Sequence, residues 1–351
     1  MAQRVEHNRL AGQIPETLAG LLGVNSDEVE VRMDDSSGAD FVITAVGRTF
    51  VVEFKQTTSA ASVVFAAKKV LEQTKRMRRR GVPLVAVPFM GDVGRRACEE
   101  AGVSWLDLCG NAHITANGIR VHIEGRPNRF RSVGRPSNVF APKSSRVVRW
   151  LLIHSDELLT QREIARATSM DEGFVSRIVA RLEREGFIVR GERSAVRPRD
   201  PALLLDAWRE RYQFSKHRMI QGHIAARSGD ALLGLACDAF GAQGVEHAVT
   251  GLAAAWVFTH FAAFQVTTIY LAVDPSAAVL QRLGFREEAR GANLWLVVPN
   301  DAGVFQGAVQ KGGVRCVHPV QVYLDLKDQP ERASEAAERL RGELLAWRRN
   351  A

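Results

Sequence analysis

The 351-residue sequence is 46% hydrophobic and 25% charged, a composition typical of a soluble globular protein with two or three domains. Its net charge of +8 favours an anionic partner, and residues 126–149 alone contain seven basic residues and no acidic one. Scattered cysteines, a polar N-terminus and the lack of a long apolar run argue against a zinc site, a disulfide framework, a signal peptide and a membrane span, so we expect a cytoplasmic protein with no membrane partner.

Residues 1–125 are predicted to form a mixed α/β domain. The order αβββαβαβ follows from periodicity and turn residues. The expected elements are a helix over 14–22, a strand over 27–33, a hairpin with arms 40–46 and 49–55, a helix over 59–80, a strand over 82–89, a helix over 93–101 and a strand over 104–108. A further hairpin over 110–125 turns at Asn117-Gly118. Its His113 and His122 could pair as ligands, although two histidines without a third ligand are more often surface or hydrogen-bonded residues.

Three charged residues lie near one end of the 40–55 hairpin. Glu53 and Lys55 project from the same face because side chains alternate along a strand, and Asp40 lies diagonally across the hairpin at a similar level. Two carboxylates and a lysine at one place could hold a Mg²⁺ ion and orient a water molecule for attack on a phosphodiester.

This element order and the D…ExK residues resemble the PD-(D/E)XK nuclease superfamily. The resemblance implies a restriction-endonuclease-like fold in which Asp40 and Glu53 bind the metal and Lys55 assists the attacking water, so that all three are catalytic if the site is active. It adds Gln56 as a common adjunct and Glu16 as a helix acid. The proline that often precedes the first acid is absent. The alternative is a nuclease-like fold that serves only in binding or dimerisation and needs no cofactor.

Residues 126–143 are rich in Pro, Gly, Ser and Arg without any period, which predicts a linker. Its arginines, with Phe130 and Phe140 between them, could follow a phosphate backbone. A second basic cluster occupies residues 75–80. Contacts of this kind add affinity without reading the base sequence.

Residues 144–200 begin with three short amphipathic helices. Ser144 is a candidate N-cap for the first helix, Thr160 and Glu163 form a capping-box pattern for the second, and Asp171 precedes the third. The third helix carries apolar residues at helical spacing and leaves small, polar and cationic side chains exposed, as a helix in a major groove requires. The predicted buried residues are Val175, Ile178, Val179 and Leu182, and the predicted exposed ones are Ser176, Arg177, Ala180 and Arg181.

A strand over 187–189 and a basic loop over 190–199 follow the helix stop at Gly186, which completes the winged helix-turn-helix order. The run Val175-Ser176-Arg177 before a leucine and this glycine resembles winged-helix regulators of the multiple-antibiotic-resistance and IclR types. The resemblance implies binding to double-stranded DNA, with Arg190, Arg193 and Arg197 near the minor groove or the phosphates. The full set expected to contact DNA is Thr160, Gln161, Ser176, Arg177, Arg181, Arg190, Arg193, Arg197 and Arg146.

Residues 201–351 are predicted to form a third, mixed α/β domain. The expected elements are a helix from residue 201, a Thr-Gly turn leading into a small-residue helix that ends at residue 258, and strands over 267–273 and 292–298. Residues 314–319 precede final helices over 320–326 and 331–348.

Three segments of this domain resemble AbiEi-family antitoxins of type IV toxin–antitoxin systems. They are residues 250–254, 293–296 and 319–326. The resemblance implies a nucleotidyltransferase-like domain in a regulator that represses its own operon. An active transferase would show a Gly-Ser element and a DxD pair, whereas Gly251 is not followed by serine and Asp274 lacks a second acid. We therefore expect a non-catalytic domain, in which Gly251 and Trp295 serve packing.

The leading hypothesis is a sequence-specific DNA-binding transcriptional regulator, in its narrower form an antitoxin-type autorepressor. It would act as a homodimer, with a toxin or another regulatory protein as a further partner. The alternative is a Mg²⁺-dependent DNA endonuclease of the PD-(D/E)XK type that the winged helix targets, and Mg²⁺ would be a cofactor only in that case. A third hypothesis is an antitoxin that binds only protein. Typical members of the antitoxin family are smaller, so the extra N-terminal domain leaves a strict antitoxin role open.

Overall fold

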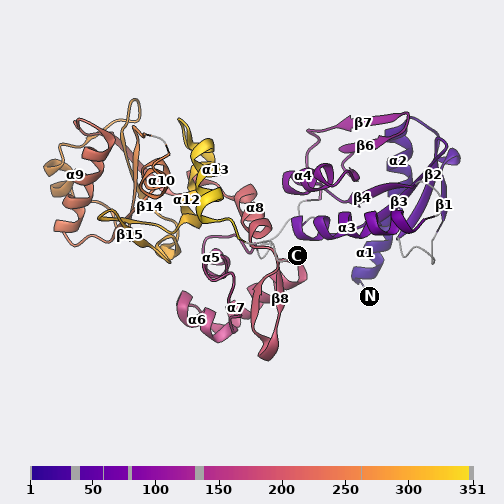
Figure 1. Cartoon of the computed structure of the whole chain (residues 1–351), viewed down its shortest axis with the longest axis horizontal. Helices are drawn as coiled ribbons and strands as arrows, with labels where there is room; N and C mark the ends of the chain where they lie inside the picture. Colours follow the sequence, from indigo (N-terminus) through magenta and orange to yellow (C-terminus); the bar gives the residue numbers. More distant parts are fainter. Residues whose placement is uncertain are drawn as a thin grey trace. The chain divides into compact units, whose positions relative to one another are not determined.

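The computed structural model describes residues 2–32, 40–57, 59–77, 81–130, 138–261 and 263–347. The chain divides into two compact units, one made of residues 1–136 with 184–186 and the other of residues 137–183 with 187–351 (Figure 1). The predicted mixed α/β, multidomain class is confirmed. Within the described ranges, every helix is too short or too polar to traverse a bilayer.

A seven-stranded sheet organises the first unit, and its strands lie side by side in sequence order (Figure 1). Strands β3, β4 and β5 are parallel, and the other neighbours are antiparallel. The elements are α1 (Ala2–Ala11), α2 (Ile14–Leu22), β1 (Glu30–Arg32), β2 (Phe41–Ala45), β3 (Arg48–Phe54), α3 (Ala60–Arg76), β4 (Val82–Val87), α4 (Asp92–Glu100), β5 (Ser104–Asp107), β6 (Ala112–Ala116) and β7 (Ile119–Ile123).

The predicted elements of this unit all appear, but the sequence did not predict α1, and one strand needs a correction. The strand expected over 27–33 begins later, because residues 26–28 form a short 3₁₀ turn before β1. Glu28 closes that turn by accepting hydrogen bonds from the backbone and side-chain nitrogens of Asn25, at 3.2 and 3.0 Å. Residues 78–80 of the second basic cluster lie outside the described residues.

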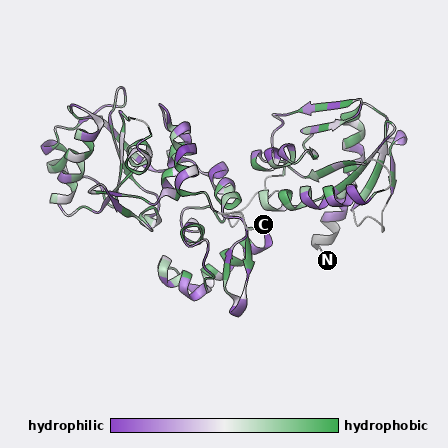
Figure 2. Ribbon diagram, in the orientation of Figure 1, coloured by the Kyte–Doolittle hydropathy of each residue, from purple (hydrophilic) through white to green (hydrophobic). Residues whose placement is uncertain are grey.

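Successive side chains of β3 point to opposite faces of the sheet and so contribute to two separate hydrophobic cores in the first unit. Phe50, Val52 and Phe54 pack with residues of α2, whereas Val51 packs with residues of α3, such as Val63. Figure 2 shows hydrophobic residues along the central strands. Since Glu53 shares its strand face with Val51, its carboxylate projects toward the α3 side and is fully buried.

The second unit opens with the winged-helix elements. Helices α5 (Ser145–Ile153), α6 (Gln161–Thr168) and α7 (Glu172–Arg184) precede an antiparallel hairpin of β8 (Ile188–Arg190) and β9 (Val196–Pro198). The three helices match their predictions. The basic loop expected over 190–199 is more regular than predicted, because its second half pairs with β8 as a strand.

The rest of the second unit surrounds another seven-stranded sheet, ordered β13-β10-β14-β12-β11-β16-β15. The predicted elements that appear are α8 (Pro201–Arg211), α10 (Gly251–Thr259), β12 (Thr267–Leu271), β14 (Leu294–Val298), α12 (Pro319–Asp325) and α13 (Ala333–Leu344). The sequence did not predict β10 (Arg218–His223), α9 (Gly229–Ala242), β11 (His247–Thr250), α11 (Ala277–Arg282), β13 (Arg286–Glu287), β15 (Val309–Lys311) or β16 (Val314–Cys316). The assignment to the nucleotidyltransferase-like fold stays a prediction.

A buried polar network joins the winged helix to this sheet domain. The guanidinium of Arg149 in α5 donates from Nε and Nη2 to Gln321 Oε1 in α12, at 3.2 and 2.6 Å. Gln321 Nε2 donates in turn to Asp325 Oδ1 at 2.7 Å. The Asp325 carboxylate also accepts hydrogen bonds from the hydroxyls of Tyr212, Thr250 and Tyr270. The linking side chains Arg149, Gln321, Asp325 and Thr250 are all buried. The winged helix and the sheet domain therefore form one packed body.

Burial raises the pKa of Asp325 to about 6, against about 3.8 for a free carboxyl. The folded protein therefore binds this proton more tightly than the unfolded chain does between these two values, and the stability that this contributes is complete below about pH 4 and lost as the pH rises through about 6. Burial lowers the pKa of His217 and His318 to about 4, so these histidines act in the opposite direction.

We expect the stability advantage of wild type over Asp325→Asn to be largest near about pH 4 and to shrink toward about pH 7, because only wild type carries the titrating carboxyl. Urea denaturation of both proteins across this range measures the difference, in which the contributions of the two histidines cancel. A difference that stays constant with pH would contradict the raised pKa.

Candidate nucleic-acid interface

Side-chain caps fix the helix-turn-helix. Thr160 Oγ1 accepts a hydrogen bond from the Glu163 amide at 3.3 Å, and Glu163 Oε2 accepts one from the Thr160 amide at 2.7 Å, so the predicted capping box is confirmed. The hydrogen bonds that Glu163 Oε2 accepts from the Thr160 amide and hydroxyl lower the pKa of Glu163. Ser169 turns the chain in the left-handed conformation with φ 54°, and Asp171 Oδ1 accepts from the Phe174 amide at 3.0 Å. The two helices are thereby held at a fixed turn.

Helix α7 presents a polar face to solvent. Its four predicted apolar residues are buried, as expected from their spacing. Ser176, Arg177 and Ala180 are exposed, whereas Arg181 is half-buried and contacts another residue. Gln161, at the start of α6, is half-buried. The exposed face is small, polar and cationic, which suits insertion into a major groove.

The wing contributes cations in three different settings. Arg190 donates from Nε and Nη2 to the carboxylate of Glu183 in α7, at 2.7 and 2.8 Å, and this pairing raises the pKa of Arg190 and lowers that of Glu183. Arg193 is exposed and adopts a positive φ of 52°. Arg197 is half-buried on β9. An exposed ion pair is weak, so Arg190 can exchange Glu183 for a phosphate at small cost.

Arg146 occupies an internal ion pair. Its Nε and Nη2 donate to the two carboxylate oxygens of Asp301 at 2.7 and 2.9 Å, and its Nη1 donates to the carbonyl oxygen of Thr168 at 3.4 Å. The hydrogen bond with Asp301 raises the pKa of Arg146. Its side chain thus links α5 to the loop after β14 and to the end of α6.

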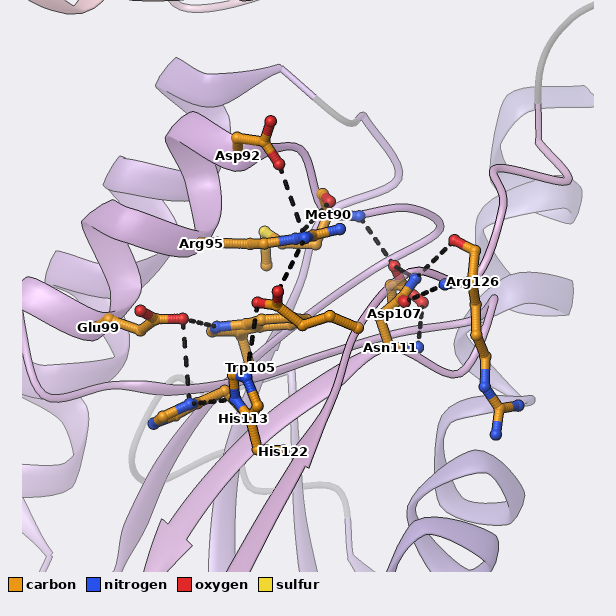
Figure 3. A network of polar contacts seen from close by, with 11 residues as sticks. Met90, Asp92, Arg95, Glu99, Trp105, Asp107, Asn111, His113, His122 and Arg126 are labelled. Carbon is orange, nitrogen blue, oxygen red and sulfur yellow. Dashed lines mark hydrogen bonds and ion pairs between the residues drawn. The ribbon is translucent and has the colours of Figure 1, made fainter.

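The start of the predicted linker is docked on the first unit (Figure 3). Asp107 accepts hydrogen bonds from the backbone and side-chain nitrogens of Asn111, at 2.9 and 2.8 Å. Asn111 Oδ1 then accepts from the Arg126 amide at 2.8 Å, and Asn111 Nδ2 donates to the Arg126 carbonyl at 3.1 Å. Residues 131–137 lie outside the described residues.

The interpretation of Phe140 as a phosphate-tracking aromatic is wrong. Its ring is buried in the second unit, where it stacks 6.4 Å from Trp208 and meets Phe187 edge-on at 6.1 Å. Phe130, by contrast, is exposed. The sequence did not predict this burial, because Phe187 and Trp208, the residues that cover Phe140, are distant from it in the chain.

The hairpin of the first unit brings together the residues that resemble a nuclease site. Lys55 Nζ lies 2.6 Å from Glu53 Oε1, and Asp40 Oδ2 accepts a hydrogen bond from the Phe54 amide at 2.8 Å. Lys69 of α3, which the sequence did not predict, places its Nζ 2.8 Å from each oxygen of Glu53. The sequence could have indicated Lys69 only through its position on α3, the helix that packs against β3.

The donor set is sparse for a metal. Glu53 Oε2 is buried, and among the described residues its charged neighbour is the Lys69 ammonium at 2.8 Å, so a metal bound to this oxygen would have to displace that ammonium. Mg²⁺ usually takes one or two carboxylates and completes its shell with water, a requirement that Glu53 and Asp40 can meet. Two ammonium groups already neutralise Glu53, however. Across the ranges that the structure describes, no cluster of three or more His, Cys, Asp or Glu could hold a metal ion.

His113 and His122 lie opposite each other on β6 and β7 with their Nδ1 atoms 3.1 Å apart (Figure 3). The rings meet edge-to-face, and the Glu99 carboxylate lies 4.0 Å from His113 Nδ1. Glu99 accepts a hydrogen bond from Trp105 Nε1 at 3.3 Å. The histidines are therefore part of a surface hydrogen-bond network, the alternative that the sequence favoured.

Two family models match the second unit. Residues 141–197 match the MarR family, and residues 198–346 match the family described as transcriptional regulator, AbiEi antitoxin, type IV TA system. No curated protein and no solved structure matches the chain. With the winged-helix geometry, the two matches define a DNA-binding transcriptional regulator. Both leave out the first unit, whose likeness to nucleases stays a prediction.

Removal of Asp301 should leave the Arg146 guanidinium half-buried without its main partner. We expect Asp301→Ala and Arg146→Ala each to lower the free energy of unfolding by roughly 1–3 kcal/mol. The double variant should lose less than the sum, because both changes break one interaction. Urea denaturation of the four proteins measures this coupling, and additive losses would contradict it.

Proposed function

We propose that this chain is a sequence-specific DNA-binding regulator of the antitoxin type that represses its own operon, with α7 in the major groove. The observation that carries the proposal is the exposed face of α7, where Ser176 and Arg177 project from a helix whose other side is buried. Direct readout requires such a face, because base edges are distinguished by hydrogen bonds and apolar contacts within the groove.

The arginines differ in their availability for DNA. Arg146 is held by Asp301 and Arg190 by Glu183, whereas Arg177 forms no hydrogen bond or ion pair in the part of the chain that the structure describes. A free guanidinium on the groove-facing helix can bind guanine through two hydrogen bonds. Arg193 at the wing tip would then supply a phosphate contact, which positions the protein without reading the sequence.

The remaining predicted contacts fit the same arrangement. Thr160 and Gln161 stand at the N-terminus of α6, where a phosphate is favoured by the helix dipole. Arg181 lies on α7 itself, and Arg197 lies on β9 of the wing. A homodimer would present two recognition helices to half-sites about one helical turn apart. The sheet domain, matched to an antitoxin family, would then bind a toxin or another regulatory protein.

Arg177→Ala should raise the dissociation constant for the selected duplex roughly 5- to 150-fold at physiological salt, since it removes one bidentate base contact. Wild-type affinity should also fall steeply with salt concentration. Fluorescence anisotropy on duplexes selected from a random pool measures both effects. Arg286→Ala, at an exposed position on β13, is the matched control. Equal binding by wild type and the Arg177 variant would refute the assignment of α7.

A second candidate function rests on the contact between Glu53 and Lys55 beside Asp40. These residues would hold Mg²⁺ through the two carboxylates, and the metal would supply an activated water for cleavage of the phosphodiester. Lys55 would hold or release a proton at that water. The winged helix would then target the cleavage to chosen sites.

Incubation with supercoiled and linear DNA in Mg²⁺ or Mn²⁺ tests this candidate. If it is correct, wild type nicks or linearises the DNA, and Glu53→Gln or Lys55→Ala abolishes the cleavage. Lys68→Ala, an exposed neighbour on α3, should cleave like wild type. The absence of cleavage with either metal would assign the three residues to scaffolding.

A further inference from the structure

The first turn of α7 carries an aromatic ring with two cations close to it. The guanidinium carbon of Arg177 lies 5.6 Å from the centroid of the Phe174 ring, and Lys143 Nζ lies 5.5 Å from the same centroid. Phe174 is half-buried, whereas Arg177 and Lys143 are exposed. These distances are within the range of cation–π attraction. The sequence pattern assigned no role to Phe174 or Lys143.

A cap at the start of α7 fixes the backbone that carries the Phe174 ring. Asp171 Oδ1 accepts the hydrogen bond of the Phe174 amide, which fixes the first turn of α7. Phe174 and Arg177 are three residues apart and so lie on the same side of the helix. Stacking on the ring restricts the Arg177 guanidinium, and a restricted planar fork loses less entropy when it binds two acceptors.

We propose that Phe174 and Arg177 together read a 5-methylpyrimidine next to a guanine, while Lys143 binds the phosphate that flanks this step. The inference rests on the proposed function and specifies what the recognition helix reads. It makes Phe174 a specificity-determining residue rather than a packing residue at the surface.

The chemistry of the three side chains supports this assignment. Guanine presents O6 and N7 as adjacent acceptors, which a guanidinium binds with two hydrogen bonds. An apolar ring at the same depth favours the C5-methyl group of a pyrimidine, since it can offer that methyl contact and no hydrogen bond. The ammonium of Lys143 is a point charge suited to a phosphate. Thymine and 5-methylcytosine both carry this methyl group, so either base could be the one that Phe174 contacts.

Base analogues test the reading without disturbing the protein fold. Duplexes selected from a random pool by the full-length chain are resynthesised with uracil for thymine, or with 7-deazaguanine for guanine, at each position in turn. We expect one thymine whose replacement weakens binding about fourfold, the equivalent of one buried methyl group. The adjacent 7-deazaguanine should weaken binding less than Arg177→Ala does, because it removes the N7 acceptor and keeps O6. Cytosine and 5-methylcytosine at the thymine position test whether 5-methylcytosine can replace thymine, because only the methylated base should restore binding.

Protein variants assign each effect to a residue. Phe174→Ala should bind thymine and uracil duplexes equally, and Arg177→Ala should bind guanine and 7-deazaguanine duplexes equally. Lys143→Ala should weaken every duplex alike and reduce the salt dependence. Thermal unfolding of each variant, followed by circular dichroism, checks that α7 is intact.

Two results overturn different claims. Tight, sequence-specific binding that tolerates uracil at every position, or selected sites without the methylpyrimidine–guanine step, refutes this reading and leaves the proposed function standing. Absence of sequence-specific duplex binding refutes the proposed function and this inference together.

Discussion

The buried guanidinium of Arg149 is the constraint on which the second unit depends. A charge removed from water is tolerated only when it is well compensated, and Gln321 together with the Asp325 carboxylate behind it provides that compensation. The face of Trp208, 5.0 Å away, adds a cation–π contact. Burial nevertheless lowers the pKa of Arg149 to about 10, and Nη1 has no hydrogen-bond partner among the described residues. Because Arg149 belongs to α5, the DNA-binding helices are built onto the sheet domain rather than tethered to it.

This construction divides the basic residues by task. Arg149 and Arg146 both project from α5, and both bind partners within the unit. Arg149 donates hydrogen bonds to Gln321, and Arg146 forms an ion pair with Asp301. The excess of positive charge in this stretch is therefore partly structural. The cations that stay available lie elsewhere, on α7 and at the wing tip. Net charge points to an anionic partner, but only the geometry separates the groups that meet the partner from those that hold the fold.

Local signals were enough to predict much of the fold. Capping at Thr160 and Asp171, the stop at Gly186 and the turn at Asn117-Gly118 depend on neighbours within a few residues, and the structure has each of them. The omitted elements have weak patterns. Helix α9 is rich in glycine and alanine, and β13 contains two residues.

Tertiary partners are a different problem. Arg146 meets Asp301 across 155 positions, and Arg149 meets Gln321 across 172. Phe140 looks like a linker residue because its covering residues are distant in the chain. The site on α7 was predictable because one helix carries most of it. Lys143 was not predictable, since it lies 31 positions before Phe174 and approaches it only through the tertiary fold.

Glu53 belongs to a sequence pattern that resembles a metal site, but the charges around its carboxylate disfavour metal binding. A nuclease carboxylate must offer its charge to a metal, yet here two ammonium groups lie within 2.8 Å of it. A lysine at the position of Lys55 is compatible with metal chemistry, because it can face the water instead. Lys69 is the discordant residue, since a cation on the same carboxylate competes with Mg²⁺ for one charge. Its side chain is half exposed and flexible, so a divalent ion that also binds Asp40 can displace it. The balance between Lys69 and a metal ion, rather than the motif itself, would decide whether these residues could act as the proposed nuclease site.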